Sequence, residues 1–104
     1  MITYEITTDV PARLVDAYER YMREDHIPAL LGTGCFRAAS FARSGPGRYR
    51  VRYEAATRAD LDRYLEMHAQ ALRDEFAARF PEGVAVSREV WTTVERWDSR
   101  PHPG

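Results

Sequence analysis

Two histidines, His26 and His68, are the side chains of this sequence best suited to proton transfer, because an imidazole changes its charge near neutral pH. His26 stands two residues before Pro28, and a proline disfavours helical backbone at the residue that precedes it, here Ile27. The spacing predicts that one helix ends at about Asp25 and that a short new helix starts near Pro28. His26 would then lie at a rigid junction, where an acid or a base can be held in place.

The neighbours of His26 bear on its charge. A helix C-terminus favours the cationic imidazole, and the carboxylates of Glu24 and Asp25 act in the same direction. The alternative is a structural role, in which the imidazole donates to the last carbonyls of the helix and fixes the turn. The residues leave both roles open.

His68 is placed by periodicity on the apolar stripe of a second helix, three residues after Leu65 and four after Tyr64. It is therefore expected to face a sheet, and the structural alternative is a buried histidine that bonds a tyrosine or a carbonyl. If His26 and His68 meet in one cavity with Tyr53, the group would suit proton transfer at a polarised carbonyl or phenol. We predict His26 and His68 as the catalytic residues.

Tyrosines are expected to fill much of the space between the sheet and the helices, at positions 4, 49, 53 and 64. Phenols around a histidine would form an aromatic cavity able to hold a planar substrate. Tyr21, Tyr53 and Tyr64 are the predicted substrate-binding residues. The alternative is plain packing, with the hydroxyl groups reaching the rim of the core.

The elements that would position these residues alternate in the order strand, helix, strand, strand, helix, strand. Alternating apolar residues predict strands over residues 2–8, 35–43 and 48–55, and a last strand from 84 to 97. Helical spacing predicts helices from about 11 to 25 and from about 57 to 80, the second opened by Thr57 and Asp60 as a variant capping box. This order predicts an α+β, ferredoxin-like βαββαβ fold, with a four-stranded antiparallel sheet that carries both helices on one face.

The other face of that sheet is expected to mix charges with two large aromatic side chains. Its predicted members are Glu5, Arg37, Phe41, Arg50, Arg52, Glu54, Glu89, Trp91 and Glu95. Solvent exposure explains the charges but not Phe41 and Trp91. A two-fold homodimer that packs sheet against sheet would bury both aromatics and let arginines pair with glutamates across the interface.

Composition limits the other partners. The 104 residues predict one domain over residues 1–98, followed by a disordered tail over 99–104 that includes His102. The net charge is −1, from 15 basic and 16 acidic residues that are interspersed, so nucleic acid is not an expected partner. No segment resembles a signal peptide or a membrane span, and the single cysteine, Cys35, fits a reducing compartment, so a cytoplasmic protein without a membrane partner is expected.

No cofactor and no metal is predicted. Two separated histidines with scattered carboxylates do not have the spacing of a metal site. The sequence also contains no Gly-rich phosphate loop, nucleophile elbow or dinucleotide fingerprint.

Several motifs together resemble the DUF4286 family of small bacterial proteins of unknown function. They are Met1-Ile2-Thr3-Tyr4, His26-Ile27-Pro28, Thr33-Gly34-Cys35-Phe36 and the helix phrase Ala59-Asp60-Leu61-Asp62-Arg63-Tyr64-Leu65. The resemblance implies a dimeric α+β barrel, an architecture shared with small cyclases, isomerases, cofactor-free monooxygenases and haem-degrading enzymes. It does not imply which of these activities the chain has.

The sequence therefore supports two hypotheses about function. In the first, the protein is a homodimer that binds an unknown small molecule in each protomer and performs cofactor-independent cyclisation or isomerisation with its histidines as acid and base. In the second, it is a non-catalytic binding or assembly module with structural histidines. An open cavity that both imidazoles reach favours the first, and a filled interior favours the second.

Overall fold

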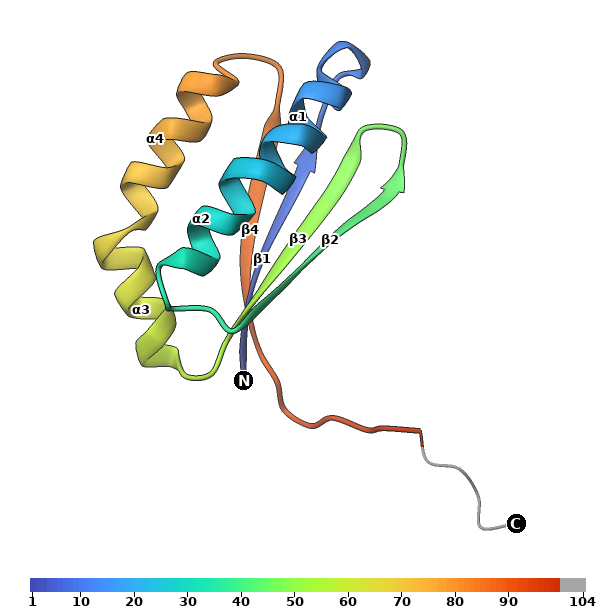
Figure 1. Ribbon diagram of the computed structural model, residues 1–104. Helices are drawn as coiled ribbons and strands as arrows, with labels where there is room; N and C mark the ends of the chain where they lie inside the picture. Colours follow the sequence, from blue (N-terminus) through green and yellow to red (C-terminus); the bar gives the residue numbers. More distant parts are fainter. Residues whose placement is uncertain (100–104) are drawn as a thin grey trace.

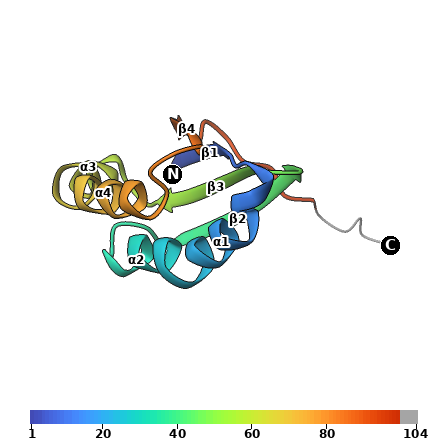
Figure 2. The ribbon, with the colours of Figure 1, turned by 90° about the horizontal axis from the view of Figure 1, so that it is seen from above.

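One antiparallel sheet and one layer of helices form the fold, which we describe from a computed structural model of residues 1–99. The strands are β1 (Ile2–Asp9), β2 (Ala38–Gly45), β3 (Arg48–Ala55) and β4 (Ala85–Thr92), in the sheet order β2-β3-β1-β4. The helical elements are η1 (Ala12–Leu14), α1 (Val15–Tyr21), η2 (Met22–His26), α2 (Ile27–Gly32), α3 (Arg58–Met67) and α4 (Ala69–Arg79). The helices all lie on one face of the sheet (Figures 1 and 2). The predicted ferredoxin-like α+β fold is confirmed.

The inner face of the sheet is built around β1, which pairs with β3 on one side and β4 on the other. Tyr4 lies opposite Tyr53 of β3 and Val90 of β4, so these three side chains point to the same face. Tyr4, Tyr49, Tyr53 and Tyr64 are all buried. The predicted inward direction of these four tyrosines is confirmed.

The helix break predicted before Pro28 is wrong. Ile27 keeps helical angles (φ −63°, ψ −46°), and the chain runs from α1 into α2 through η2, a π-helical turn. A wider turn tolerates the proline because Pro28 has no N–H to donate and its ring would crowd the carbonyl four residues earlier in a regular helix. The short helix expected around Pro28 is present as α2, which ends at Gly32.

The second predicted helix is broken in two at His68, whose backbone leaves the helical region (φ −127°, ψ −31°). Its start is as predicted, since the Thr57 side chain accepts a hydrogen bond from Asp60 N at 3.2 Å. A straight helix of this length would diverge from a twisted sheet. After the break Ala69 is buried, and Leu72 and Phe76 of α4 pack against the core. Within residues 1–99, no helix combines the length and the apolar character needed to cross a membrane.

The prediction that Phe41 lies on the open face of the sheet is wrong. Phe41 lies opposite Val51 and stacks on Tyr49, with ring centroids 5.4 Å apart, so it faces the helices. β2 begins only at Ala38, and buried Phe36 precedes it, so the alternation assumed from residue 35 onward is out of phase. A one-residue slip exchanges the two faces of a strand.

The last strand is shorter than predicted, because β4 ends at Thr92 instead of continuing to residue 97. Val94 and Trp97 follow it as exposed residues, and Glu95 therefore does not belong to the open face. Trp91 does lie on that face, opposite Thr3 of β1. The predicted disordered tail, apart from Ser99, lies outside the described residues.

Candidate functional site

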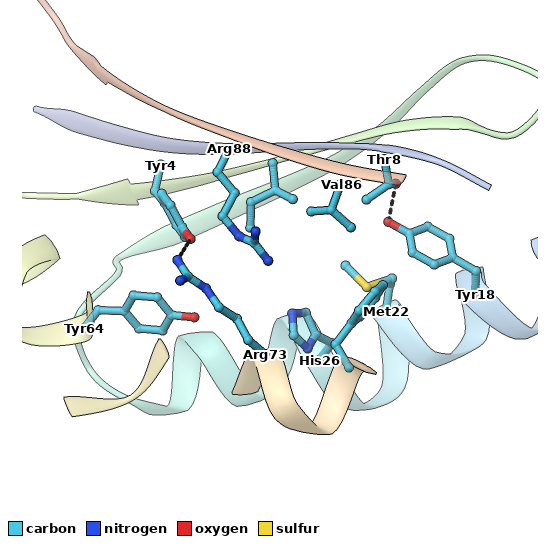
Figure 3. A pocket seen from close by; sticks show the side chains of 11 residues that line it. Tyr4, Thr8, Tyr18, Met22, His26, Tyr64, Arg73, Val86 and Arg88 are labelled. Atoms are coloured by element: carbon cyan, nitrogen blue, oxygen red, sulfur yellow. Dashed lines mark hydrogen bonds between the residues drawn. The ribbon is translucent and has the colours of Figure 1, made fainter. Parts of the chain in front are cut away.

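A small cavity lies between the inner face of the sheet and the helices (Figure 3). The strands contribute Tyr4, Ile6, Thr8, Val86 and Arg88. The helices contribute Tyr18, Met22, His26, Tyr64, Arg73 and Phe76. The cavity has a volume of about 30 Å³, which is room for one or two water molecules. It reaches solvent beside the edge strand β4, where Arg88 is exposed.

His26 is held against the cavity by the π-helical turn. Met22 and His26 lie four residues apart at its two ends and are both buried, so they share the face that looks toward the sheet. The imidazole ring packs against Tyr21 and Phe76, with centroids 5.7 Å and 5.6 Å away. Its Nδ1 atom is buried and has no hydrogen-bond partner among the described residues. Single π turns of this kind recur at functional sites.

The environment of His26 favours the neutral imidazole, contrary to the sequence-based expectation. Burial lowers the pKa of His26 to about 4, and the positive charge of Arg88 acts in the same direction. Glu24 and Asp25, which were expected to favour the cation, are exposed and point away from this surface. At neutral pH His26 therefore has a free lone pair and can accept a proton or a hydrogen bond.

The phenols around the cavity are protonated and can donate. Burial raises the pKa of Tyr64 above its usual range, with the nearby hydroxyl of Tyr4 adding to the effect. Burial also raises the pKa of Tyr18 to about 12, and its hydroxyl is engaged with Thr8 Oγ1 at 2.7 Å. Tyr18 is therefore a structural anchor, whereas Tyr64 has a hydroxyl free to meet a ligand.

Two arginines face the same space from opposite walls (Figure 3). Arg73 Nη2 of α4 donates to the Tyr4 hydroxyl at 3.1 Å, and its Nε is buried without a partner in the described chain. Arg88 lies on β4 opposite Ile6 of β1, so its side chain leaves the inner face of the sheet. The cavity thus combines a neutral base, a phenol donor and two guanidinium groups.

The predicted site residues are only partly brought together. His26 and Tyr64 line the cavity, but His68, Tyr53 and Tyr21 are not among its lining residues. His68 is half-buried at the break between α3 and α4, where its ring stacks on Tyr64 at 6.4 Å. Tyr53 is fully buried in the core, and its hydroxyl has no partner within residues 1–99. Tyr21 packs against the His26 ring without lining the cavity.

Arg73 and Arg88 are the site residues that the sequence analysis missed, although the sequence contains a signal for each. Arg88 interrupts the apolar alternation of Val86 and Val90, so the period of the strand places a charge on the inner face. Arg73 stands four residues after Ala69 and three before Phe76, on the side of the helix that packs on the sheet. A charge in an apolar register is the informative pattern in both cases.

Comparisons with known proteins agree with this fold. The profile of a family described as "Domain of unknown function (DUF4286)" matches residues 1–94. A search of curated proteins finds no match to the sequence.

Solved structures with the same fold include HapK from Hahella chejuensis, with a TM-score of 0.71 and 14% identity over 97% of this chain and 100% of that one. The haem degrader MhuD from Mycobacterium tuberculosis, solved with two haems bound, has a TM-score of 0.69 and 14% identity over 94% and 100% of the two chains. A dimeric ferredoxin-like protein from an uncultured marine organism has a TM-score of 0.69 and 7% identity over 95% and 100%. At these identities the likeness establishes the fold alone.

Proposed function

The chain belongs to the DUF4286 family, and from that premise we propose that it binds a small molecule between sheet and helices and isomerises or cyclises it without a cofactor. The observation that carries this proposal is the buried, neutral His26, whose Nδ1 has no partner among the described residues and which lines a cavity with a protonated Tyr64. His26 accepts a proton from a carbon next to a carbonyl, and Tyr64 donates a hydrogen bond to the carbonyl oxygen. The same proton returns to another atom of the molecule, so its composition is unchanged.

Haem, which MhuD binds, does not fit the cavity of this chain. Ligands of that size occupy pockets of several hundred Å³, and the space beside His26 is about 30 Å³. We therefore assign the proposed chemistry to side chains of this protein and not to haem.

The small volume of the cavity favours a second candidate, a non-catalytic binding module. A cavity of about 30 Å³ admits a group of a few atoms and not a whole substrate. In this reading His26 accepts a hydrogen bond from the ligand and performs no proton transfer. The two candidates differ in turnover.

A probe of isomerisation separates them. Cyclohex-3-en-1-one becomes the conjugated enone when a base removes the proton next to the carbonyl and returns it further along the ring, and ultraviolet absorbance follows the change. We expect the protein to accelerate this reaction and His26→Gln to reduce the acceleration at least a hundredfold, as for loss of a general base. His68→Gln, outside the cavity, should stay within twofold of the wild type. Binding of the probe without acceleration of its isomerisation would favour the binding module. An equal loss of acceleration in His26→Gln and His68→Gln would contradict the assignment of His26 as the general base.

We also propose a homodimer through the open face of the sheet. Trp91 is 54% exposed there, beside a surface hollow of about 420 Å³ whose walls include Ser40, Arg52 and Glu54. Glu5 and Arg52 form an ion pair of 2.9 Å on the same face. A two-fold related copy would place its own Trp91 in the hollow and present the same mixed charges. A protein of the same fold is described as dimeric, which supports the proposal of a dimer.

Trp91→Glu should weaken the dimer at least tenfold, because a buried tryptophan is the side chain most often responsible for interface affinity. Sedimentation velocity over a range of concentrations measures the dissociation constant. Trp97→Glu is the matched control, since Trp97 is exposed beyond the end of β4 and off the sheet. If Trp97→Glu dissociates the protein and Trp91→Glu does not, the chain after β4 is the interface and the open face is not.

A further inference from the structure

We propose that Arg73 and Arg88 form the recognition site for a carboxylate group of the ligand, which enters the cavity beside β4 with its apolar part trailing outward. This inference rests on the proposed function, because it names the chemical class of molecule that the cavity takes. It concerns which ligands bind, and it does not depend on whether they are turned over.

Arg73 and Arg88 have no acidic partner among the described residues, a property that they share with Arg13, Arg20, Arg50 and Arg79. Of these six arginines, only Arg73 and Arg88 line the cavity. Arg52 and Arg58 lie 2.9 Å and 3.0 Å from carboxylate oxygens of Glu5 and Asp62. Within residues 1–99, neither Arg73 nor Arg88 lies within 4.0 Å of any carboxylate.

The two guanidinium groups also line the same cavity and act on the same titratable side chains. Both positive charges lower the pKa of Tyr64, in opposition to the larger effect of burial. Arg88 in addition disfavours the cation of His26. Two like charges that meet in a partly buried space repel each other, and an anion placed between them removes that repulsion.

The donors in the cavity match the oxygens of a carboxylate. Arg73 already uses Nη2 on Tyr4, but its Nε has no partner in the described chain. Arg88 and the Tyr64 hydroxyl supply further donors on the other walls. Arginine binds carboxylates through charge-assisted hydrogen bonds, which are stronger than those between neutral groups.

The size and lining of the cavity set the orientation of the ligand. A volume of about 30 Å³ suits the two oxygens of one carboxylate, since it would hold one or two waters. Phe76 and Val86 line the same space and offer apolar contacts to the rest of the molecule. The ligand class is therefore a compact carboxylate with an apolar or aromatic body.

Benzoate and its neutral isostere benzamide test the inference. We expect benzoate to perturb the backbone amide NMR signals of His26, Phe76 and Arg88, and benzamide to bind at least tenfold more weakly. Arg88→Gln should weaken benzoate binding tenfold or more, because it removes a hydrogen bond to a charged group. Arg50→Gln is the matched control, an exposed arginine of β3 opposite Thr7 on the other face of the sheet, and should leave the affinity unchanged.

The outcomes separate this inference from the proposed function. If benzamide binds as well as benzoate, or if Arg88→Gln and Arg50→Gln behave alike, the carboxylate site is overturned while the role of His26 is untouched. If benzoate binding depends on Arg88 but His26→Gln leaves isomerisation unaffected, the carboxylate site stands and the proposed chemistry fails. The absence of any shift at the cavity with benzoate also overturns the inference.

Discussion

Acidification from pH 7 to pH 5 is expected to lower the free energy of unfolding by about 2 kcal/mol through His26 alone, and by about 3 kcal/mol if the pH is taken to 4. The cause is the burial of His26, which lowers its pKa in the folded protein to about 4 from the ordinary value of 6.5. Between these two values the unfolded chain binds a proton at His26 and the folded protein does not. The folded state is therefore destabilised progressively as the pH falls through this window.

The charged residues around His26 also predict that the folded protein loses stability as the pH falls. Arg88 from β4 and Arg73 from α4 line the cavity and are both cationic, and the side chains of Tyr21 and Phe76 that pack on the ring carry no charge at this pH. None of the residues that line the cavity is a carboxylate. Among the described residues that line the cavity, no negative charge compensates a proton on the imidazole.

Urea unfolding at pH 7, 6 and 5 measures the effect, in the wild type and in His26→Gln. The wild type should lose stability with a slope approaching 1.4 kcal/mol per pH unit below pH 6. The Gln variant should lack this component, and the two proteins should respond alike between pH 8 and pH 7. The range ends at pH 5 because carboxylates such as Glu19, whose pKa is lowered chiefly by its hydrogen bond from Tyr49, begin to contribute below it. A wild type that loses less than about 0.5 kcal/mol between pH 7 and 5 would contradict the buried, neutral state of His26.

Regular alternation made two of the strands predictable from the sequence. In β1 and β3 the inner residues follow one another without interruption, and Tyr4 and Tyr53 meet across the ladder as their patterns require. β2 differs because the chain changes phase between buried Phe36 and inward-facing Phe41, before regular pairing is established. Pattern alone does not reveal such a slip, since the residues on both sides of it are apolar.

The errors in the predicted helix boundaries have a similar origin, because tertiary packing outweighed the local helix preference of the residues. Pro28 is a strong local signal, but a π turn absorbs it and the helix continues. His68 interrupts the second helix although neither Gly nor Pro stands there. The local preference of a few residues is small beside the burial of side chains such as Tyr18 and Leu61, which are fully enclosed.

The sequence predicted the part of the candidate site that a single residue type indicates without knowledge of its neighbours in space. His26 was identified from its chemistry and from the proline beside it, and it does line the cavity. Its partners were not identified, because Arg73 and Arg88 come from elements far apart in the sequence and are brought together by the pairing of β4 with β1. His68 has the same chemistry as His26, but the break at its own backbone leaves it outside the cavity.

Gly47→Ala is expected to destabilise the protein by roughly 3 kcal/mol or more, because two costs combine at this position. Gly47 lies in the left-handed region (φ +73°), and an added Cβ would stand 2.3 Å from the carbonyl oxygen of Val10. Val10 has little freedom to move, since it is buried and its N–H donates to Gly47 O at 2.7 Å. The clash is therefore with fixed backbone and not with a flexible side chain.

Two other glycines separate these costs. Gly34 has a similar φ of +78°, but no atom of residues 1–99 lies within 4 Å of an added Cβ, so Gly34→Ala should lose only about 1–2 kcal/mol from backbone strain. Gly45 has neither a positive φ nor a close neighbour, so Gly45→Ala should change stability by less than about 0.5 kcal/mol. Urea unfolding of the three variants should rank them in that order.

The Gly47 contact also bears on the candidate site, because Val10 is the link between β1 and the helices that carry His26. If Val10 is displaced, α1 and η2 must shift relative to the strand that holds Tyr4 and Thr8. Gly47→Ala should therefore weaken the contact between Thr8 and Tyr18 and perturb the NMR signals of His26, some distance from the substitution, whereas Gly34→Ala should not. Equal destabilisation by Gly47→Ala and Gly34→Ala would show that backbone strain alone operates and that the hairpin between β2 and β3 does not fix the position of the first helix.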